Sequence, residues 1–524
     1  MVEMPVFQLL TNSAARFPDH VAIRFENRTY TYQELKEHVD RLSTVLAHLG
    51  IQKGDRVALI FQNSPEYIIS YYGVLQAGGI VVQVNPFYKE RELLNILQDS
   101  EAGWVLCEKE QWDKLKTIQS HTNIQQILLF GLEPEATVEN AVHVEQLLAS
   151  TQANPPDIPF HVKEDVAVLQ YTGGTTGRSK GAMLTHYNLV ANVQQCYQMA
   201  ASILQIPGEI MLCLIPLYHV YSMTSCMNYA IFLGATIVLR RKFDVNEVFE
   251  LIQKYRPTLF PAVPTMFIAL LNHPKSNEVD LSSLKHCISG SAPIPTEIIR
   301  RFEEKTGAII TEGYGLSEAS PVTHRNPLQG KRKPGSIGIP LPYTEAKIVD
   351  LETGTKTLPP GKEGELVVRG PQVMKGYWKN PEETKQALRD GWLYTGDIAK
   401  RDEENYYYIV GRKKEMIITG GFNVYPNEVE EVLYKHPGVR EAAVIGITDD
   451  YRGEAVKAFI VPQPHVSLTE DELIQFCRSQ LANYKVPRCI EFRDSLPKSN
   501  VGKVLRRILV EEERRKRGDK NEHR

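Results

Sequence analysis

Apolar residues near the start of the chain recur at helical spacing. Thr31 and Glu34 make a Thr-x-x-Glu capping box, and a leucine or valine then occupies positions 35, 39, 42, 46 and 49 before Gly50. A capping box satisfies free backbone N–H groups in the first turn of a helix, and glycine commonly follows the last turn. The pattern therefore predicts an amphipathic helix between these residues.

Short, continuously apolar segments alternate with helical ones in the part that follows. Such segments are typical of parallel strands that are buried on both faces. Strands are expected at residues 56–61, 79–84, 104–107 and 166–170, and helices at residues 67–77 and 90–98. The alternation continues to about residue 340 and predicts a layered α/β domain with a largely parallel sheet.

The pattern changes twice towards the C-terminus. The elements expected there are strands at 345–349, 364–369 and 406–410, a helix at 426–434, strands at 441–447 and 455–461, and a helix at 470–481. The first three strands predict a small, more antiparallel subdomain, and the remaining elements predict an α+β unit long enough to fold separately. We therefore expect an N-terminal domain at residues 1–411, a linker at 412–414 and a smaller C-terminal domain at 415–524.

Composition indicates the general class of protein but does not identify the reaction it catalyses. Of the 524 residues, 42% are apolar and 23% are charged, as in an ordinary globular enzyme. The 60 basic side chains nearly cancel the 63 acidic ones, so the global charge gives no reason to expect a nucleic-acid partner. The one concentrated run of charge, at residues 511–517, is expected to be a frayed and solvated tail.

The seven cysteines form no Cys-x-x-Cys pair and do not combine with histidines at zinc spacing. We expect them to be reduced core residues of a cytoplasmic protein. Residues 1–10 lack a cationic start followed by an apolar core, and no segment reaches the ~18 uninterrupted apolar residues of a membrane span. Secretion and a membrane-spanning segment are therefore not expected.

A glycine- and threonine-rich loop follows the buried strand at 166–170. Glycine lets the backbone bring its N–H groups to an anion, while threonine hydroxyls and a lysine add donors and charge. The residues predicted to bind nucleotide phosphates are Thr172, Gly173, Gly174, Thr175, Thr176, Gly177 and Lys180. The loop is not a Walker A loop, since no frame supplies GxxxxGK[ST]. Gly313 and Gly315 begin like a dinucleotide fingerprint, but Glu318 replaces its third glycine.

This loop resembles the phosphate-binding signature of the adenylate-forming superfamily, which contains acyl- and aryl-CoA synthetases, adenylation domains of peptide synthetases and beetle luciferases. Further motifs of that superfamily follow in the expected order. They are Pro-Leu-Tyr-His at 216–219, Gly-Tyr-Gly-Leu-Ser-Glu at 313–318, Tyr-Thr-Gly-Asp at 394–397, Gly-Arg-Lys-Lys-Glu at 411–415 and Pro-Lys-Ser-Asn-Val-Gly-Lys at 497–503. The segments at 420–426 and 499–504 are most similar to bacterial fatty acyl-CoA ligases. The resemblance implies a large N-terminal domain followed by a mobile, smaller C-terminal domain.

The implied reaction begins with attack of a carboxylate on the α-phosphate of ATP, which brings two anions together and expels pyrophosphate. By resemblance, Lys503 bridges the carboxylate and the α-phosphate, and His219 lies beside the acyl carboxylate. Glu318 together with Thr172 or Thr176 is expected to hold Mg²⁺ through oxygen ligands.

The resemblance also assigns the nucleoside site. Asp397 is expected to bind the ribose, with Arg412 as a second contact to the sugar or a phosphate, and Tyr314 is expected to lie against the adenine. The other residues assigned to the nucleotide are Gly290, Ser291, Ala292, Pro293, Gly313, Gly315 and Ser317.

Thioester formation requires Lys503 to leave, so that the thiol of coenzyme A can reach the same carbonyl. In the superfamily the C-terminal domain rotates about the residue two places after the motif arginine, which is Lys414 here. The residues assigned to the coenzyme A path are Gly420, Gly421 and Phe422, and those assigned to the acyl tunnel are Tyr218 and Met223. Some long-chain members have a tryptophan where this chain has Met223, so the preferred chain length stays open.

The sequence thus predicts an ATP-dependent acid–thiol ligase that joins a fatty acid to coenzyme A through an acyl-adenylate. An aryl-CoA ligase, of the hydroxycinnamate type, differs only in its acyl pocket and is the leading alternative. The second alternative is an inactive nucleotide-binding homologue. The expected partners are ATP, Mg²⁺, coenzyme A and the fatty acid, while peripheral membrane contact and a homodimer stay open.

Overall fold

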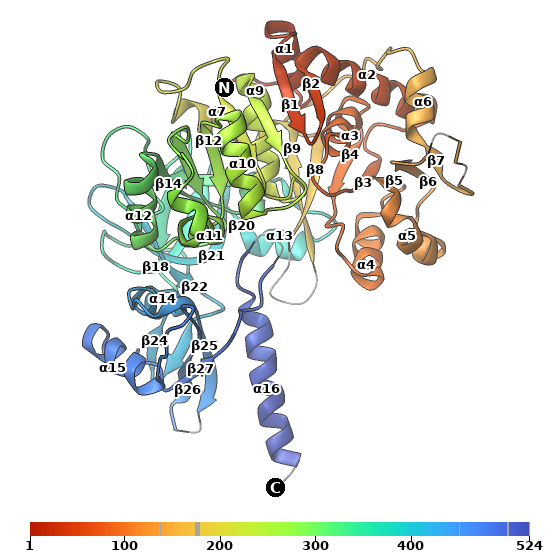
Figure 1. Cartoon of the computed structure of the whole chain (residues 1–524). Helices are drawn as coiled ribbons and strands as arrows, with labels where there is room; N and C mark the ends of the chain where they lie inside the picture. The colour runs from red at the N-terminus through yellow and green to blue at the C-terminus, as the bar shows by residue number, and fades with distance from the viewer. Residues whose placement is uncertain (134, 137, 173–178, 450, 500–501, 523–524) are drawn as a thin grey trace.

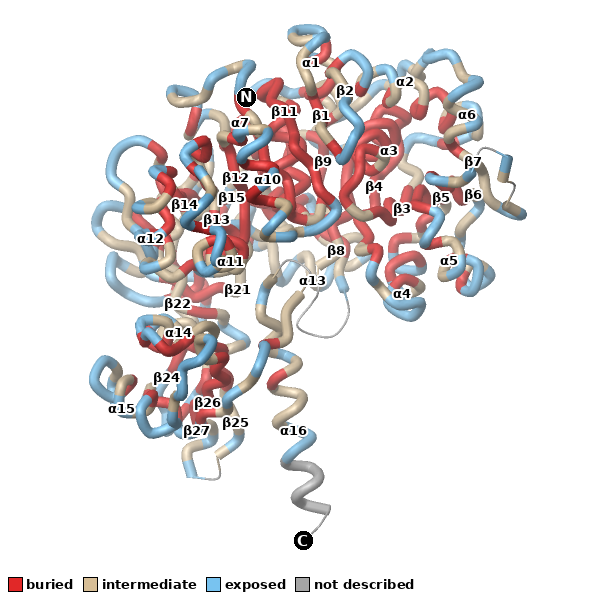
Figure 2. Tube along the Cα trace, viewed as in Figure 1, coloured by how far each residue is buried: buried red, intermediate tan, exposed pale blue. Residues whose placement is uncertain are grey.

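The computed structural model describes residues 1–522 except residues 134, 137, 173–178, 450 and 500–501. Two large sheets with packed helices form the N-terminal part, and the C-terminal domain lies below them in the view of Figure 1. Buried residues are concentrated in the strands of the sheets and in the helices between them (Figure 2). In the described part of the chain, no helix is long and apolar enough to cross a membrane.

One sheet contains most of the strands predicted near the N-terminus. Its strands, in spatial order, are β19 (Gly376–Tyr377), β9 (Lys180–Thr185), β8 (Val166–Thr172), β4 (Ile80–Gln83), β3 (Arg56–Ile60), β5 (Trp104–Glu108), β6 (Gln126–Phe130) and β7 (Val142–His143). Strands β8 to β7 pair in parallel, whereas β9 and β19 are antiparallel. The predicted parallel sheet is therefore confirmed, with an antiparallel edge.

The second sheet runs through the middle third of the chain and also takes in two N-terminal strands. In spatial order it contains β16 (Ile339–Pro340), β15 (Val322–Arg325), β14 (Ile309–Gly315), β13 (His286–Ser289), β12 (Leu259–Ala262), β10 (Ile210–Cys213), β11 (Thr236–Leu239), β1 (Val21–Phe25) and β2 (Arg28–Thr31). Its pairs from β14 to β1 are parallel, and its outer pairs are antiparallel.

Helices cover and separate these two sheets. They are α1 (Gln8–Arg16), α2 (Tyr32–His48), α3 (Pro65–Gln76), α4 (Glu90–Ser100), α5 (Trp112–Ile118), α6 (Val144–Ser150), α7 (His186–Gln198), α8 (Val220–Ser222), the π-helix η3 (Met223–Asn228), α9 (Tyr229–Leu233), α10 (Val245–Tyr255), α11 (Pro264–Asn272), α12 (Thr296–Thr306) and α13 (Pro381–Ala387). One hydrophobic core joins residues of β3, α3, α7 and β11, so both sheets pack on shared helices. The predicted helix α2 has its capping box, because the Thr31 hydroxyl accepts from the Glu34 N–H and the Glu34 carboxylate accepts from the Thr31 N–H.

The predicted antiparallel subdomain follows. Its strands are β17 (Glu345–Val349), β18 (Gly364–Arg369), β20 (Leu388–Arg389), β21 (Trp392–Arg401) and β22 (Tyr407–Arg412). The C-terminal domain then contains β23 (Ile417–Thr419), β24 (Phe422–Val424), α14 (Pro426–Tyr434), β25 (Val439–Asp449), β26 (Gly453–Pro462), α15 (Glu470–Gln480), β27 (Cys489–Phe492) and α16 (Arg506–Glu522). It has its own hydrophobic core between its sheet and α14 and α15.

The charged end of the chain differs from the prediction of a frayed tail. It belongs to α16, which projects from the body of the protein (Figure 1). Glu513 pairs with Lys457 at 2.9 Å, and Glu512 pairs with Arg493 at 2.7 Å. The charges therefore connect the helix to the C-terminal sheet, which composition alone could not indicate.

Candidate functional site

A cavity of about 2650 Å³ lies between the N-terminal part and the C-terminal domain. Strands β8 and β14 end at this cavity, and a third group of wall residues follows β13. Ligands of open α/β sheets commonly bind outside the carboxyl ends of the strands. The predicted site residues on its wall are Thr172, Lys180, Tyr218, His219, Gly290, Ser291, Gly313, Tyr314, Gly315, Ser317, Glu318, Arg412, Lys414 and Lys503.

Other predicted residues are not on this wall. Gly173, Gly174, Thr175, Thr176 and Gly177 lie outside the described residues. Asp397, Met223, Ala292 and Pro293 lie behind or beside the wall, and Gly420, Gly421 and Phe422 lie elsewhere on the C-terminal domain.

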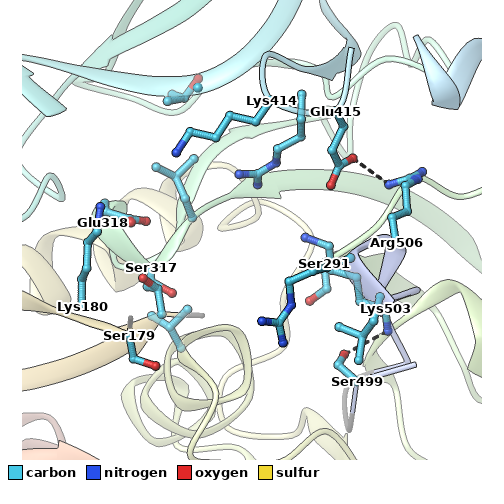
Figure 3. Close-up of a pocket in the computed structure, with 18 of the residues that line it drawn as sticks. Ser179, Lys180, Ser291, Ser317, Glu318, Lys414, Glu415, Ser499, Lys503 and Arg506 are labelled. Atoms are coloured by element: carbon cyan, nitrogen blue, oxygen red, sulfur yellow. Dashed lines mark hydrogen bonds and ion pairs between the residues drawn. The ribbon is translucent and has the colours of Figure 1, made fainter. Parts of the chain in front are cut away.

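Thr172 and Lys180 flank the phosphate-binding loop and are opposite each other in the pairing of β8 with β9. The Lys180 ammonium group forms an ion pair with Glu383 and lies 5.4 Å from the centre of the Tyr377 ring. The Tyr377 hydroxyl donates to Glu318 Oε1 at 2.8 Å. Tyr377 thus connects the loop lysine to Glu318, and Figure 3 shows Lys180 and Glu318 on the same side of the cavity.

Tyr377 and Glu383 were missed by the sequence interpretation. Both lie outside the recognised motifs, and no local pattern distinguishes them from other surface residues. They reach the site because β19 adds to the edge of the first sheet beside β9.

Glu318 can contribute to a Mg²⁺ site. Its Oε1 accepts from Tyr377, and its backbone oxygen accepts from the Met374 N–H at 2.8 Å, which fixes its position. The described residues contain no cluster of three histidine, cysteine or carboxylate side chains that could hold a metal ion. Mg²⁺ is usually held by one or two carboxylates together with substrate phosphates, and a carboxylate and a threonine hydroxyl on one cavity wall fit that donor set.

Asp397 and Arg412 are direct partners in the pairing of β21 with β22, and Asp397 Oδ1 lies 2.8 Å from Arg412 Nε. The other carboxylate oxygen accepts from the Tyr314 hydroxyl. Burial raises the pKa of Asp397, and the Arg412 charge opposes that rise. Asp397 is only 2% exposed, so the predicted ribose ligand is covered by its two partners in this arrangement.

The two glycines of the Gly-Tyr-Gly segment differ in how much space a side chain would have. A β-carbon on Gly315 would lie 2.2 Å from the carbonyl oxygen of Pro321, which no side chain permits. A β-carbon on Gly313 would meet nothing closer than 3.8 Å. Packing therefore requires the second glycine, while the first leaves the wall of the cavity open.

His219 is held in one tautomer. It caps α8, and its Nδ1 accepts from the Tyr221 N–H at 3.2 Å. The proton of the neutral ring must then be on Nε2. Burial lowers the pKa of His219 to about 4, and the nearby charge of Lys503 adds to the effect. The ring is therefore a neutral hydrogen-bond donor at physiological pH.

The C-terminal lysine loop rests on the N-terminal domain. The Lys503 N–H donates to Ser499 Oγ at 3.2 Å, and the Ser499 N–H donates to the Lys503 carbonyl at 2.8 Å. Gly502 packs so closely on Thr265 that a β-carbon would lie 2.6 Å from its hydroxyl. This contact brings the lysine into the cavity, opposite Lys180 and Glu318 (Figure 3).

Burial and neighbouring charged groups both influence the protonation of Lys503. Burial of its ammonium group lowers the pKa of Lys503, and the charge of Arg412 lowers it further. The residue keeps solvent access through the cavity, while protein atoms surround the charged group. Its charge in turn acts on His219 and Asp397, so the loop places one cation between the predicted acyl and ribose residues.

Arg506 fastens the lysine loop to the C-terminal domain. Its guanidinium pairs with Glu415 at 3.0 Å and with Glu430 at 2.7 Å. Glu415 directly follows the predicted hinge residue Lys414. Arg506 was not predicted, because it follows the last recognised motif and its sequence neighbours do not show that it pairs with Glu415 and Glu430.

The predicted coenzyme A segment faces away from the cavity. Phe422 is 56% exposed and stacks on Tyr484 with ring centres 4.7 Å apart. Gly420 and Gly421 have positive φ values of 57° and 83°, with nothing within 4 Å of a β-carbon. Lys503 is thus inside the site while this segment is outside it.

The cavity also extends towards α7 and the π-helix η3. Its wall there contains Val193, Cys196, Thr224, Ser225, Tyr229, Val322 and Arg325. Met223, which was predicted to line the acyl tunnel, is fully buried behind the wall, where its sulfur accepts from Gln83 Nε2 at 3.1 Å. Gln83, which lines the cavity, also accepts from the Tyr67 hydroxyl at 2.7 Å, so one side chain on the wall separates the thioether from the cavity.

Comparison with known families agrees with this arrangement of motifs. The family model described as AMP-binding enzyme matches residues 10–378, and the model of the AMP-binding enzyme C-terminal domain matches residues 428–503. The chain belongs to the AMP-binding enzyme family, the adenylate-forming superfamily.

Two curated relatives illustrate the range of similar proteins. A long-chain-fatty-acid–CoA ligase of Bacillus subtilis is 46% identical over 96% of this chain and 94% of its own length. A feruloyl-CoA synthase of Amycolatopsis is 37% identical over 93% of this chain and 95% of its own length.

Solved structures share the whole fold. The anthranilate CoA ligase AuaEII in complex with anthranoyl-AMP has a TM-score of 0.89 at 28% identity, covering 97% of each chain. ATP-bound MatB from Rhodopseudomonas palustris has a TM-score of 0.87 at 33% identity, covering 97% of this chain and 99% of that one. The predicted α/β fold with a smaller C-terminal domain is therefore confirmed.

Proposed function

We infer that the protein is an AMP-forming acyl-CoA ligase that joins a long-chain fatty acid to coenzyme A through an acyl-adenylate. The observation that carries this assignment is the meeting of Lys503 with His219, Glu318 and Lys180 around one cavity. Similarity to fatty acid ligases over nearly the whole chain supports the same activity.

In the first half-reaction, a carboxylate oxygen attacks the α-phosphorus of ATP and the bond to the β-phosphate breaks. Lys503 neutralises the approaching anions, and burial together with the charge of Arg412, which lower its pKa, make an anion beside it favourable. His219 donates from Nε2 to the carboxylate and orients it. Lys180 stabilises the leaving pyrophosphate.

Glu318, together with Thr172, would hold Mg²⁺ against the phosphates. The ion, when bound, neutralises phosphate charge. The described protein groups fix the position of Glu318 through Tyr377, so its carboxylate is oriented before any ligand arrives.

In the second half-reaction, the sulfur of coenzyme A attacks the acyl carbonyl, the bond to the phosphate oxygen breaks, and AMP leaves. The thiol proton passes to solvent. We propose that the C-terminal domain turns about Lys414, which withdraws Lys503 and brings Gly420, Gly421 and Phe422 to the opening. The outward position of Phe422 while Lys503 is inside supports alternation between the two arrangements.

The test is substrate-dependent pyrophosphate release, measured for fatty acids of increasing length and for a few aromatic acids, with and without coenzyme A. We expect release with long fatty acids and conversion to the thioester only when coenzyme A is present. The chain is also similar to a feruloyl-CoA synthase. If hydroxycinnamates were preferred over fatty acids, the protein would be assigned as an aryl-CoA ligase. Absence of release with every acid would identify an inactive nucleotide-binding protein.

A further inference from the structure

Arg325 is a buried cation on the acyl side of the cavity. It ends β15, is 4% exposed, and lies on the cavity wall. Its Nε donates to the Thr311 hydroxyl at 3.2 Å. A guanidinium has five N–H donors. Within the described part of the chain, Arg325 has no further side-chain hydrogen bond and no carboxylate partner.

Other arginines with little exposure in the described part of the chain are paired. The buried Arg240, which is 8% exposed, lies 2.6 Å from Glu247, and the partly buried Arg506 is held by two glutamates. Removing an unpaired charge from water is costly, and proteins normally compensate it with an opposite charge. Arg325 differs from these residues in facing a cavity, from which a ligand can supply the missing anion.

A second unpartnered donor belongs to a residue on the same part of the cavity wall. Tyr229 is 4% exposed, lines the wall, and its hydroxyl has no hydrogen-bond partner among the described residues. Burial raises the pKa of Tyr229, and the charge of Arg325 opposes the rise. Burial likewise raises the pKa of Cys196 to about 11 against the same charge. All three side chains line the cavity, and the charge of Arg325 acts on the other two.

This region is separate from the reacting end of the cavity. Arg325 ends β15 in the N-terminal part and shares its stretch of wall with residues of α7 and α9, whereas Lys503 enters the cavity from the C-terminal domain. One cavity thus contains a cation for the reacting carboxylate and another on its acyl side.

We propose that Arg325 and Tyr229 bind a second carboxylate, so that the protein activates acids with a carboxylate at both ends in preference to simple fatty acids. This inference rests on the proposed ligase activity and specifies its substrate. A carboxylate can accept two parallel bonds from a guanidinium and a third from the tyrosine hydroxyl. The methyl end of an ordinary fatty acid would leave these donors without partners.

The experiment measures kcat/KM for pyrophosphate release with α,ω-dicarboxylic and monocarboxylic acids of equal carbon number, over several lengths, with coenzyme A present. We expect the dicarboxylic acid to be preferred at least about tenfold at one range of lengths, since a desolvated charged bond is worth 1.5–3 kcal/mol or more. Arg325→Met, which keeps the length of the side chain, should reverse the preference. Tyr229→Phe should reduce it less.

The ratio of two acids on one enzyme preparation is independent of the fraction of folded protein, so a less stable variant still gives an answer. Arg241→Met is the matched control, because Arg241 is a half-exposed arginine paired with Glu108 and should leave the ratio unchanged. A monocarboxylic preference at every length, or a ratio that Arg325→Met does not alter, would overturn the proposal. Failure of the ligase assignment itself looks different, since then neither kind of acid releases pyrophosphate.

Discussion

Gly502 lies directly against Thr265, and a β-carbon on Gly502 would stand 2.6 Å from the threonine hydroxyl. Gly502 also has a φ of +73°, which side chains other than glycine rarely adopt. One residue of the C-terminal loop thus determines how closely Lys503 approaches the N-terminal domain.

Gly502→Ala should therefore impair adenylation selectively. Overpacking and backbone strain typically cost about 1–3 kcal/mol, which corresponds to a loss of about tenfold to a hundredfold in the rate of acyl-adenylate formation. Thioester formation from supplied acyl-adenylate should change by less than about twofold. Gly361→Ala is the matched control, because Gly361 has a φ of +80° but nothing within 4 Å of its β-carbon. Equal effects of both variants would refute a steric role for the Thr265 contact.

Lys503→Ala removes the cation itself. We expect acyl-adenylate formation to fall by a factor of about 10² or more, as on loss of a single group that stabilises transition-state charge. The second half-reaction, assayed with supplied acyl-adenylate and coenzyme A, should be retained. Lys485→Ala, which breaks the ion pair of a C-terminal-domain lysine with Glu428 away from the cavity wall, provides the control. If the two half-reactions fell together, Lys503 would not be specific to adenylation.

Asp397→Asn tests the nucleoside site. The change removes a charge-assisted bond to Arg412 and weakens any bond to the ribose hydroxyls, so we expect the KM for ATP to rise about tenfold to a hundredfold. Steady-state pyrophosphate release at varied ATP measures it. Asp402→Asn alters a carboxylate paired with Lys333 away from the cavity and should leave the KM unchanged. An unaltered KM in Asp397→Asn would remove Asp397 from the nucleotide site.

Acid should destabilise the fold through two buried histidines. Burial lowers the pKa of His186 and of His324 to about 3, well below the usual value near 6.5. Between these pH values the unfolded chain binds more protons, so the free energy of unfolding falls as the pH drops below about 6.5. The loss is at most about 1.4 kcal/mol per pH unit for each histidine.

Urea unfolding at pH 7.0, 6.0 and 5.5 measures this loss in a window where most carboxylates stay ionised. The His186 Nδ1 accepts from the Val6 N–H at 3.1 Å, so protonation at that atom must break the bond. His186→Gln should have a shallower pH dependence than the native protein. A free energy of unfolding that is constant over this range would contradict the burial argument.

The sequence predicted local elements well wherever periodicity and end signals agreed. The helix after Thr31 has its capping box, and the strand expected at 56–61 is β3 of the parallel sheet. The same signals failed at residues 511–517, because a charged helix is stabilised there by ion pairs with strands far away in the sequence.

Residues of the candidate site could be predicted from the sequence only where they belong to a recognised motif. Lys503 and Glu318 belong to motifs, and the structure brings them to one cavity. Tyr377 and Arg325 belong to none, and their importance comes from sheet edges and burial that a linear pattern does not contain. Met223 was placed by its motif position on the tunnel wall, and the structure has it buried one side chain behind that wall, in contact with Gln83.

The ion pairs of Arg506 with Glu415 and Glu430 have one more consequence. All three residues belong to the C-terminal domain, so the loop of Lys503 is fastened to the same rigid body that carries Phe422 on another face. A lysine mounted in this way would leave the site together with the domain when it makes the turn proposed about Lys414. The order of the two chemical steps would then follow from the movement of one body, without a separate signal.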